Sequence, residues 1–328
     1  MKKGRKVLII IGSILLTIAI TWIIIGVIPP QKAVENTNPW RKTDRTLISA
    51  HRGGANLNPE NTEKAFDYVI NETTYTDIVE IDVRLTKENE LVIIHDDSIN
   101  RTGIKDQNAE SVVIRQTYYN DLLKYNLGIN FEVVENGEKT YPYENLKEEE
   151  LKAQGLQIMT LDEFLDKYEE SRYFRLLLEI KDTKEDAKIA VDKAEEIIAK
   201  YPEWDERIMM ISFSTDAVKY SLENYPERYV AGMGYNMIEF LIGSQLNLDC
   251  LFNVKFQSVQ SSMITKAGPI SINCATQTFI DSAHARNQCV AYWTINEESD
   301  MRKLIDLGAD VITTNSPDLL AKVLGVID

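Results

Sequence analysis

The sequence predicts an α/β fold: a (β/α)8 TIM barrel with an inserted segment, preceded by one N-terminal transmembrane helix. Strand-like apolar runs alternate with helical patterns from residue 46 onward, as parallel strands joined by crossover helices do. A 22-residue run without charged side chains, residues 7–28, lies near the N-terminus. Histidine and charged side chains stand at or near the ends of several predicted strands, where such barrels gather their functional groups.

Composition is that of a globular protein. Hydrophobic residues make up 44% of the 328 residues and charged residues 27%, which leaves no sign of disorder. The formal net charge of −15 argues against nucleic acid as a partner, because nucleic-acid-binding proteins carry basic faces. Cys250, Cys274 and Cys289 fit no zinc pattern, and an odd number cannot pair completely, so we expect buried free thiols.

The apolar run at residues 7–28 follows a basic hexapeptide, MKKGRK. Its length matches the roughly 30 Å hydrocarbon core of a bilayer. A cleaved signal peptide would have an apolar region of roughly 7–15 residues and a small-residue cleavage site. The run ends instead in Pro29-Pro30-Gln31, so the pattern favours a retained anchor over a cleaved signal. Basic residues stay on the cytoplasmic side, which places the rest of the chain outside.

These features divide the chain into a cytoplasmic tail (1–6), an anchor (7–28), a polar linker (29–44) and a barrel (45–328). Four of the 36 basic residues precede the anchor, which leaves 32 against 51 acidic residues outside, a net charge of −19. Anionic lipid repels so acidic a domain. We therefore expect the anchor, and not surface charge, to hold the barrel at the cell membrane.

Nine runs have the apolar character of strands, one more than the barrel needs. They are residues 46–50, 78–83, 91–95, 175–180, 207–213, 229–233, 269–272, 290–295 and 311–314. Helical patterns intervene at residues 60–70, 160–168, 184–200 and 215–225. Only seven residues separate 78–83 from 91–95, whereas a parallel crossover needs a dozen or more. Either a crossover helix is missing here or residues 91–95 fold back as a hairpin.

Residues 103–157 are the predicted insertion. The segment is polar and weakly periodic, with a loop-like centre at 134–143. Loops at the carboxyl face of a barrel carry specificity, so we expect it to shape the substrate mouth. Its tyrosines either stack on a ligand or, as we favour, pack the insertion: Tyr118, Tyr119, Tyr125, Tyr141 and Tyr143.

Two carboxylates share one strand face in the run IVEIDV. Side chains alternate along a strand, so Glu80 and Asp82 point the same way. Burying them together is costly unless a cation lies between them, and Mg²⁺ or Ca²⁺ suits oxygen ligands. The run RLLLEIK places Glu179 and Lys181 on one face in the same way. Each run alone could be an ordinary core strand, but together they indicate a metal-assisted phosphate site.

A set of short motifs carries a family resemblance. They are HRG (51–53) with PENT (59–62), E-x-D (80–82), HD (95–96), EIK (179–181), YWTIN (292–296) and GADVITTNSPD (308–318). Together they resemble the glycerophosphodiester phosphodiesterase family, a group of phospholipase C-like barrels, over roughly residues 45–328. The resemblance implies hydrolysis of a glycerophosphodiester to glycerol phosphate and an alcohol.

The same resemblance implies the metal ligands. It assigns Glu80, Asp82 and Glu179 to a divalent cation, with Glu60 as a candidate fourth ligand, directly or through water. Ca²⁺ is favoured and Mg²⁺ is the alternative.

The resemblance also makes His51 and His95 the general acid and general base, as suits the poor leaving group of a phosphodiester. Arg52 and Lys181 would supply positive charge to the phosphate oxygens. Each has a purely structural alternative: Arg52 would pair with Glu60, and Lys181 would neutralise Glu179. Trp293 is either a rim aromatic that contacts the glycerol or a barrel-core residue.

Two residues lie outside this assignment. The family usually has Asp where this chain has Asn315, a departure that falls on one polar contact near the barrel rim and not on the predicted metal ligands. His284 lies in a helical run without nearby carboxylates, so we expect a structural role for it.

The predicted substrate is a small-molecule or polymeric glycerophosphodiester outside the cell. One alternative is phospholipase C-like cleavage of an intact lipid, which would need a hydrophobic rim that the polar insertion does not provide. Another is a non-catalytic envelope-binding barrel, which would have lost a histidine or a carboxylate. The sequence leaves open which diester and cation are used, and whether water or a substrate hydroxyl attacks.

Overall fold

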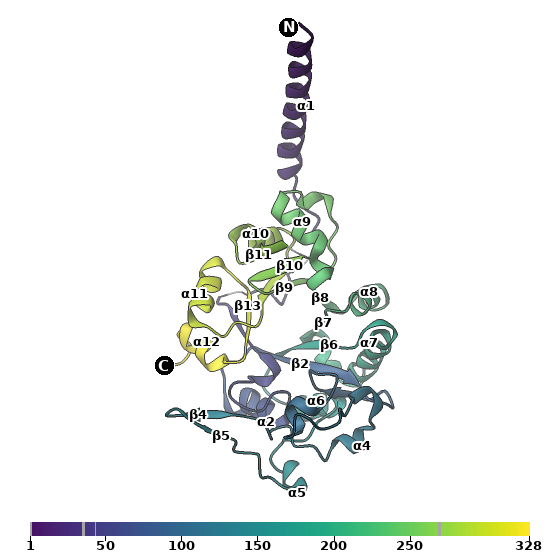
Figure 1. The fold of residues 1–328 in the computed structure, drawn as a ribbon, viewed down its shortest axis with the longest axis vertical. Coiled ribbons are helices and arrows are strands. Elements are labelled where there is room, and N and C mark those ends of the chain that lie inside the picture. The colour runs from purple at the N-terminus through teal and green to yellow at the C-terminus, as the bar shows by residue number, and fades with distance from the viewer. Residues whose placement is uncertain (1, 35–36, 43, 268–269) are drawn as a thin grey trace.

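Eight parallel strands close into a barrel with helices around it, in a computed structural model that describes residues 2–34, 37–42, 44–267 and 270–328 (Figure 1). The order around the barrel is β1-β2-β6-β7-β8-β9-β12-β13, and β13 pairs with β1 to close it. The strands are β1 (Leu47–Ala50), β2 (Ile78–Leu85), β6 (Arg175–Ile180), β7 (Ile208–Ile211), β8 (Tyr229–Met233), β9 (Ser258–Ser261), β12 (Cys289–Tyr292) and β13 (Val311–Thr314). The predicted (β/α)8 barrel is confirmed.

The barrel is covered by helices that follow its strands. They are α2 (Glu63–Asp67), α6 (Leu161–Tyr168), α7 (Lys184–Ile198), α8 (Thr215–Asn224), α9 (Ile238–Leu246), α10 (Gln277–Ala285), α11 (Glu298–Leu307) and α12 (Pro317–Val323). The first begins three residues later than predicted, because Thr62 caps it by accepting a hydrogen bond from the backbone N–H of Ala65.

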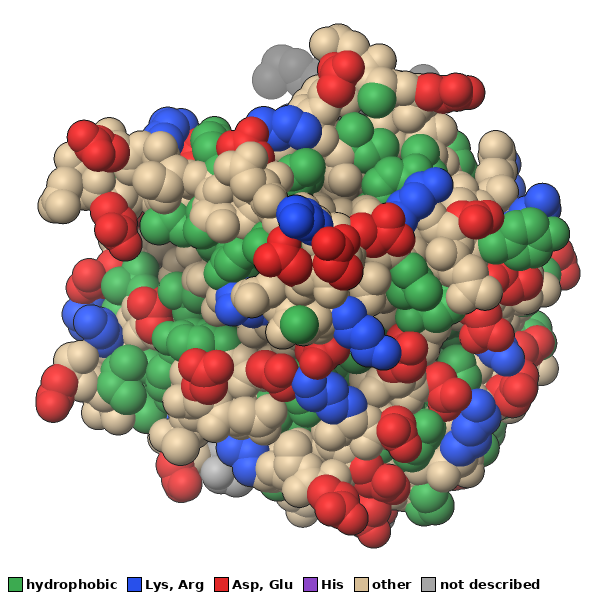
Figure 2. Space-filling model, turned by 90° about the horizontal axis from the view of Figure 1, so that it is seen from below, with side chains coloured by type: hydrophobic (Ala, Val, Ile, Leu, Met, Phe, Trp, Pro, Cys, Tyr) green, Lys and Arg blue, Asp and Glu red, His purple; other side chains and the backbone are tan. Residues whose placement is uncertain are grey.

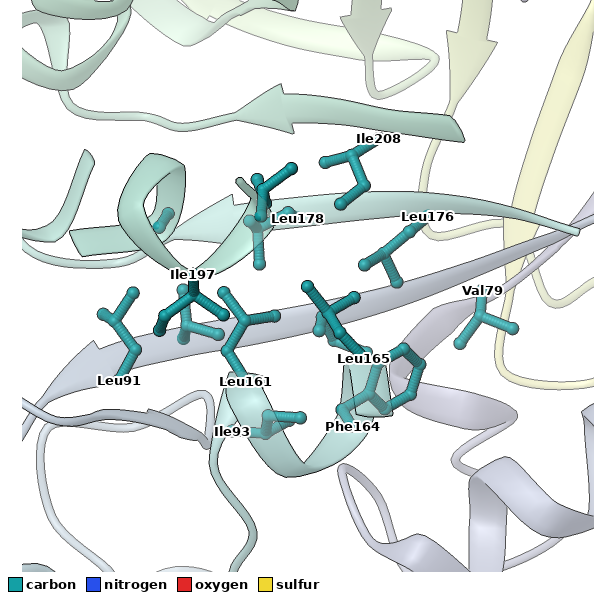
Figure 3. Packing of buried hydrophobic residues seen from close by; sticks show 14 of the residues in the cluster. Val79, Leu91, Ile93, Leu161, Phe164, Leu165, Leu176, Leu178, Ile197 and Ile208 are labelled. Atoms are coloured by element: carbon teal, nitrogen blue, oxygen red, sulfur yellow. The ribbon is translucent and has the colours of Figure 1, made fainter. Parts of the chain in front are cut away.

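The strands are apolar on both faces because helices cover one side and the barrel core fills the other. Leu176 and Leu178 of β6 pack outward against Phe164 of α6 and its neighbours (Figure 3). Leu177, which lies between them, belongs instead to the cluster inside the barrel. This alternation turns Glu179 inward, since it is two residues beyond Leu177.

Residues 91–95 fold back as a hairpin and do not form a barrel strand. Strand β3 (Leu91–Ile93) pairs antiparallel with β2, in the register Val83↔Ile93. The backbone N–H of Ile94 then donates to the carbonyl of Asp82 at 2.9 Å. The hairpin therefore brings His95, the next residue, back to the level of Asp82 on β2.

The prediction of a barrel strand at 269–272 is wrong. Residue 269 lies outside the described residues, and β11 (Ile270–Asn273) pairs with β10 (Ile264–Ala267) in a separate hairpin. The barrel position belongs to β9, whose sequence SVQS lacks an apolar run. Ser258 and Gln260 are buried although they are polar, and such a strand gives no hydrophobic signal.

The insertion between β3 and α6 contains short elements and a small core of its own. Its elements are α3 (Asn100–Gly103), α4 (Tyr119–Leu122), β4 (Val133–Glu135), β5 (Glu138–Thr140) and α5 (Glu148–Leu151). The predicted loop-like centre contains the β4–β5 hairpin, which turns on Asn136 and Gly137, both with left-handed φ angles. The Tyr119 hydroxyl donates to Glu163 and the Tyr141 hydroxyl to Glu132, which supports the packing interpretation of these tyrosines.

Helix α1 (Lys2–Gly26) projects from the barrel (Figure 1). Its segment Lys6–Gly26 is long and apolar enough to cross a membrane, as a membrane anchor or a signal peptide would be. The following linker packs on the amino-terminal end of the barrel, where the Asn38 side-chain amide donates to the carbonyl of Gln257 and Trp40 is buried.

Candidate active site

An acidic cluster occupies the barrel interior where β2 and β6 lie side by side. Asp82 of β2 is in register with Glu179 of β6, and Glu80 shares the inward face of β2. Their exposed fractions are 2% for Glu80, 0% for Asp82 and 7% for Glu179. One carboxylate oxygen from each of the three lies within 4.8 Å of the other two. A single ion at their centre would touch all three.

The protein alone does not satisfy Glu80. Its Oε2 accepts a hydrogen bond of 2.8 Å from the backbone N–H of Arg52, but its buried Oε1 has no hydrogen-bond partner among the described residues. Burial and then the neighbouring Asp82 and Glu179 raise the pKa of Glu80 well above its usual value. Burial and Asp82 also raise the pKa of Glu179. A hard divalent cation with oxygen ligands fits this set.

Two cationic side chains offset part of the charge. The Lys181 Nζ lies 2.7 Å from Glu179 and 3.1 Å from Asp82. The Arg52 Nε lies 3.3 Å from the other Asp82 oxygen. Burial opposes ionisation of Asp82, but Lys181 and Arg52 outweigh it and lower its pKa to about 2. Arg52 and Lys181, the two side chains predicted to bind phosphate, thus both contact predicted metal ligands.

The HRG motif forms a tight left-handed turn after β1. Arg52, Gly53 and Gly54 have φ angles of 53°, 78° and 86°. A Cβ on Gly53 would lie 2.9 Å from the Phe66 ring, so only glycine fits there. The turn directs the backbone N–H of Arg52 onto Glu80, which explains why this motif accompanies the carboxylates.

His51 is held from its Nδ1 side. This nitrogen lies 2.6 Å from Oδ1 of Asn315, which follows β13. An amide oxygen only accepts, so Nδ1 carries the hydrogen and Nε2 has the free lone pair. Burial, and then the Arg52 guanidinium, lower the pKa of His51 to about 4. The residue that orients His51 is therefore the one at which this chain has Asn where the family usually has Asp.

His95 has a charged partner instead. Its Nδ1 lies 2.6 Å from Oδ1 of Asp96, whose other oxygen accepts from Arg101 Nε. The hydrogen bond with His95, joined by Arg101, lowers the pKa of Asp96 below its usual range. Asp96 directly follows His95 in the sequence, and that position was a signal for this pairing. Nothing in the sequence pointed to Arg101.

Glu60, the candidate fourth ligand, is not part of the cluster of Glu80, Asp82 and Glu179. It accepts from Arg52 Nη1 at 2.9 Å and from both terminal nitrogens of Arg101, at 2.7 and 2.9 Å. Although burial opposes ionisation, Arg101 and Arg52 lower the pKa of Glu60. Its two oxygens are engaged by arginines, as the structural alternative for Arg52 expected.

Trp293 is partly buried: it packs against the cluster inside the barrel and also lines a pocket at the rim. Its ring packs edge-to-face against Phe213, with centroids 5.2 Å apart. The two rings, with Tyr235, Ile238 and Leu241, line a pocket of about 430 Å³ at the carboxyl ends of β7, β8, β9 and β12.

His284 does have a carboxylate partner, contrary to expectation. Its Nε2 lies 2.8 Å from Oδ2 of Asp310, a fully buried residue that also accepts from the backbone N–H of Val290. Asp310 precedes β13, so this pair lies at the amino-terminal end of the barrel, opposite His51. The structural role predicted for His284 remains the better interpretation.

Three carboxylates, two histidines and two cations at the carboxyl ends of barrel strands are typical of a metal-assisted phosphoester hydrolase. The model of the glycerophosphoryl diester phosphodiesterase family matches residues 51–319, and the chain belongs to that family. It is 25% identical to a glycerophosphodiester phosphodiesterase of Bacillus subtilis over 85% of this chain and 87% of the relative. The chain is therefore an enzyme with glycerophosphodiester phosphodiesterase activity.

Solved structures agree on the fold. A putative glycerophosphoryl diester phosphodiesterase from Silicibacter pomeroyi superposes with a TM-score of 0.65 at 18% identity, over 88% of this chain and 96% of its own. A phosphodiesterase from Oleispira antarctica, in complex with the product sn-glycerol-3-phosphate, superposes with a TM-score of 0.60 at 19% identity. The match covers 86% of this chain and 97% of the other.

We expect Glu80→Gln to stabilise the cation-free protein at neutral pH. The pKa of Glu80 is raised in the folded state. The wild type therefore loses stability as the pH rises from 4.5, the pKa in the unfolded chain, to the higher pKa in the folded protein. A neutral amide avoids this loss and can keep the hydrogen bond from Arg52.

The measurement is the melting temperature in EDTA between about pH 5 and about pH 8. The advantage of Glu80→Gln over wild type should grow with pH, whereas Glu203→Gln on the surface should change little. A variant less stable than wild type at every pH would contradict the account of the cluster.

Proposed function

We propose that this enzyme hydrolyses glycerophosphodiesters with a divalent cation held by Glu80, Asp82 and Glu179. The observation that carries the proposal is a buried Glu80 oxygen, close to two further carboxylates, that has no hydrogen-bond partner in the described parts of the chain. Ca²⁺ is favoured over Mg²⁺ because it accepts many protein oxygens, whereas Mg²⁺ retains several waters. The cation would polarise a phosphoryl oxygen and offset the charge that develops there.

Lys181 and Arg52 complete the phosphate site in this proposal. An ammonium group has three donors, and two of those of Lys181 face Glu179 and Asp82, so one is left for a non-bridging oxygen. Arg52 is fixed by Glu60 and Asp82 and offers a planar fork. Glu60 is assigned here to the positioning of Arg52, and not to the cation.

The histidines divide the proton transfers between them. His51 is neutral near pH 7 and has a free Nε2, so it takes the proton from the attacking water or substrate hydroxyl. His95 gives a proton to the departing alkoxide as the P–O bond breaks, and the ionised Asp96 balances the charge of its protonated ring. Attack by water gives glycerol phosphate and an alcohol directly, whereas attack by a substrate hydroxyl releases the alcohol and leaves a cyclic glycerol phosphate, which water then opens to glycerol phosphate.

The proposed substrates are small or polymeric glycerophosphodiesters, and glycerol phosphate as product matches the ligand of the Oleispira antarctica structure. Cleavage of a lipid phosphodiester is the second candidate. It is favoured by the pocket of Trp293 and Phe213, which supplies the apolar rim that the insertion lacks. The complete set of histidines and carboxylates opposes the non-catalytic alternative.

We also propose that α1 is a retained anchor with the barrel outside the cell. Its 21-residue apolar segment would span about 31 Å at about 1.5 Å per residue, close to the hydrocarbon core. Every residue from Lys6 to Thr21 is exposed, so the barrel does not bury that part of the helix.

Removal of the cation should abolish activity. Exhaustive EDTA treatment followed by buffer exchange should stop the release of glycerol phosphate from a glycerophosphodiester, and Ca²⁺ or Mg²⁺ should restore it. Activity that survives this treatment in full would show that the carboxylates work without a cation.

Loss of either histidine should slow hydrolysis by about 10²–10⁴-fold. His51→Ala and His95→Ala should each show this loss. The double variant should lose far less than the product of the two single fold-losses, because the pair acts as a unit. A nitrophenyl diester, whose leaving group needs no acid, should rescue His95→Ala only. The acid limb of the pH profile should lie near pH 4, since a base must lose its proton to act.

The matched control is His284→Ala, which removes a histidine at the far end of the barrel and should leave the rate nearly unchanged. If the single variants of His51 and His95 both hydrolyse glycerophosphodiesters at wild-type rates, the two-histidine mechanism is wrong and a binding role becomes the better explanation.

The proposed topology predicts the outcome of proteolysis on intact protoplasts. Protease added outside should digest the barrel and leave a membrane-bound stub that contains α1. A fully protected barrel would reverse the orientation, and a barrel released into the medium would indicate a cleaved signal.

A further inference from the structure

Helix α9 has an apolar stripe on its outer side. Ile238, Ile242 and Leu246 lie four residues apart, so they share one face, and they are 44%, 42% and 49% exposed. Phe240 and Leu241 of the same helix are buried against the barrel. The helix therefore presents hydrophobic side chains in two directions, although only one of them is covered by the protein.

Neighbouring helices of the barrel do not share this property. The outer side of α8 exposes Asp216, Lys219 and Glu223, as expected of a helix that faces water. The stretch 234–273 around α9 contains only four charged residues in 40, compared with 27% for the whole chain. One of them, Asp249, is paired with Arg286. The outer side of α9 is thus both apolar and poor in charge.

Leu251, in the turn that follows α9, is a further exposed apolar residue, at 58%. We call Ile238, Ile242, Leu246 and Leu251 the apolar face. The hairpin β10–β11 lies nearby in Figure 1 and exposes Ile264 and Ile270.

Helix α1 joins the barrel at this same place. The Trp22 indole N–H donates to the carbonyl of Leu246 at 2.7 Å, and the Cys250 thiol lies 3.4 Å from the carbonyl of Ile25. Figure 1 shows α9 directly below α1, with β4, β5 and α5 at the opposite end of the molecule. Figure 2 views that opposite end and shows acidic side chains across it.

We propose that the apolar face lies in the interface of the lipid bilayer, so that the barrel rests on its α9 side. The proposal depends on the proposed anchor, because a membrane crossed by α1 comes within contact distance of Leu246. A bilayer is a better occupant than a second copy of the chain, since the anchor delivers it to this face without any association step. The low charge of the region avoids the repulsion that the acidic remainder of the chain would meet at anionic lipid.

This placement has a consequence for the active site. Ile238 is the first residue of the stripe and also lines the pocket of Trp293 and Phe213. The stripe thus runs from the rim of the mouth to the base of the anchor. The rim would open at the height of the lipid headgroups, while the insertion faces away from the membrane.

The test uses the full chain reconstituted in phosphatidylcholine vesicles, with a fluorescent label on one introduced cysteine. Cys250→Ser removes the partly exposed native thiol, whereas Cys274 and Cys289 are buried. The test site is Ile242→Cys, and the matched control is Lys219→Cys on the outer side of α8. Both native side chains are exposed, so neither substitution removes a core contact.

Lipid that carries a doxyl quencher should reduce the emission of the label at 242 several-fold and leave that at 219 unchanged. The depth found for 242 should be roughly 5–10 Å below the headgroups, where interfacial helices place their apolar side. Equal emission at the two sites, in protein that floats with the vesicles, would overturn this proposal alone. Protein that does not float would overturn the anchor as well. If the label at 242 is not quenched by lipid, and cysteines at 242 cross-link two chains, a second copy of the chain covers the apolar face and the bilayer does not.

Discussion

Electrostatic repulsion among Glu80, Asp82 and Glu179 is the constraint on which the rest of the site depends. The barrel topology places β2 beside β6 and turns all three carboxylates into a space that water scarcely reaches. Three negative charges at such distances are unstable without compensation. Arg52 and Lys181 supply two positive charges, and within the described part of the chain one Glu80 oxygen still lacks a hydrogen-bond partner. A phosphodiester is also negatively charged, and its non-bridging oxygens need nearby positive charge. The cationic side chains that the carboxylates hold in place can supply it.

A chain of charged contacts links this cluster to one of the two histidines. It runs from Arg52 through Glu60 and Arg101 to Asp96, which holds His95. His51 is held separately by a neutral amide. The two rings therefore differ in the charge of their partners, which is the physical basis for assigning them opposite proton-transfer roles. A positive-φ turn at Arg52 fixes the start of this chain of contacts, and Gly53 and Gly54 continue that turn.

Much of this arrangement was predictable from local sequence patterns. Apolar runs identified seven of the eight barrel strands, and alternation along IVEIDV and RLLLEIK predicted which carboxylates share a face. Strand β9 was missed because its inward residues are polar and leave no hydrophobic signal. The engagement of Glu60 by Arg101 and the pairing of His284 with Asp310 join residues 41 and 26 positions apart. Such contacts are fixed by tertiary packing, and neither spacing nor periodicity records them.

In the proposed mechanism a cation completes the carboxylate cluster and in doing so displaces a proton from it. Calorimetric titration of Ca²⁺ into the cation-free chain at neutral pH, repeated in buffers of different ionisation enthalpy, measures both events directly. The account predicts one ion bound per chain with release of a proton, because Glu80 must ionise to bind it. In Glu80→Gln the proton release should vanish and binding should weaken. Absence of binding to the wild type, or binding that Glu80→Gln leaves unchanged, would contradict it.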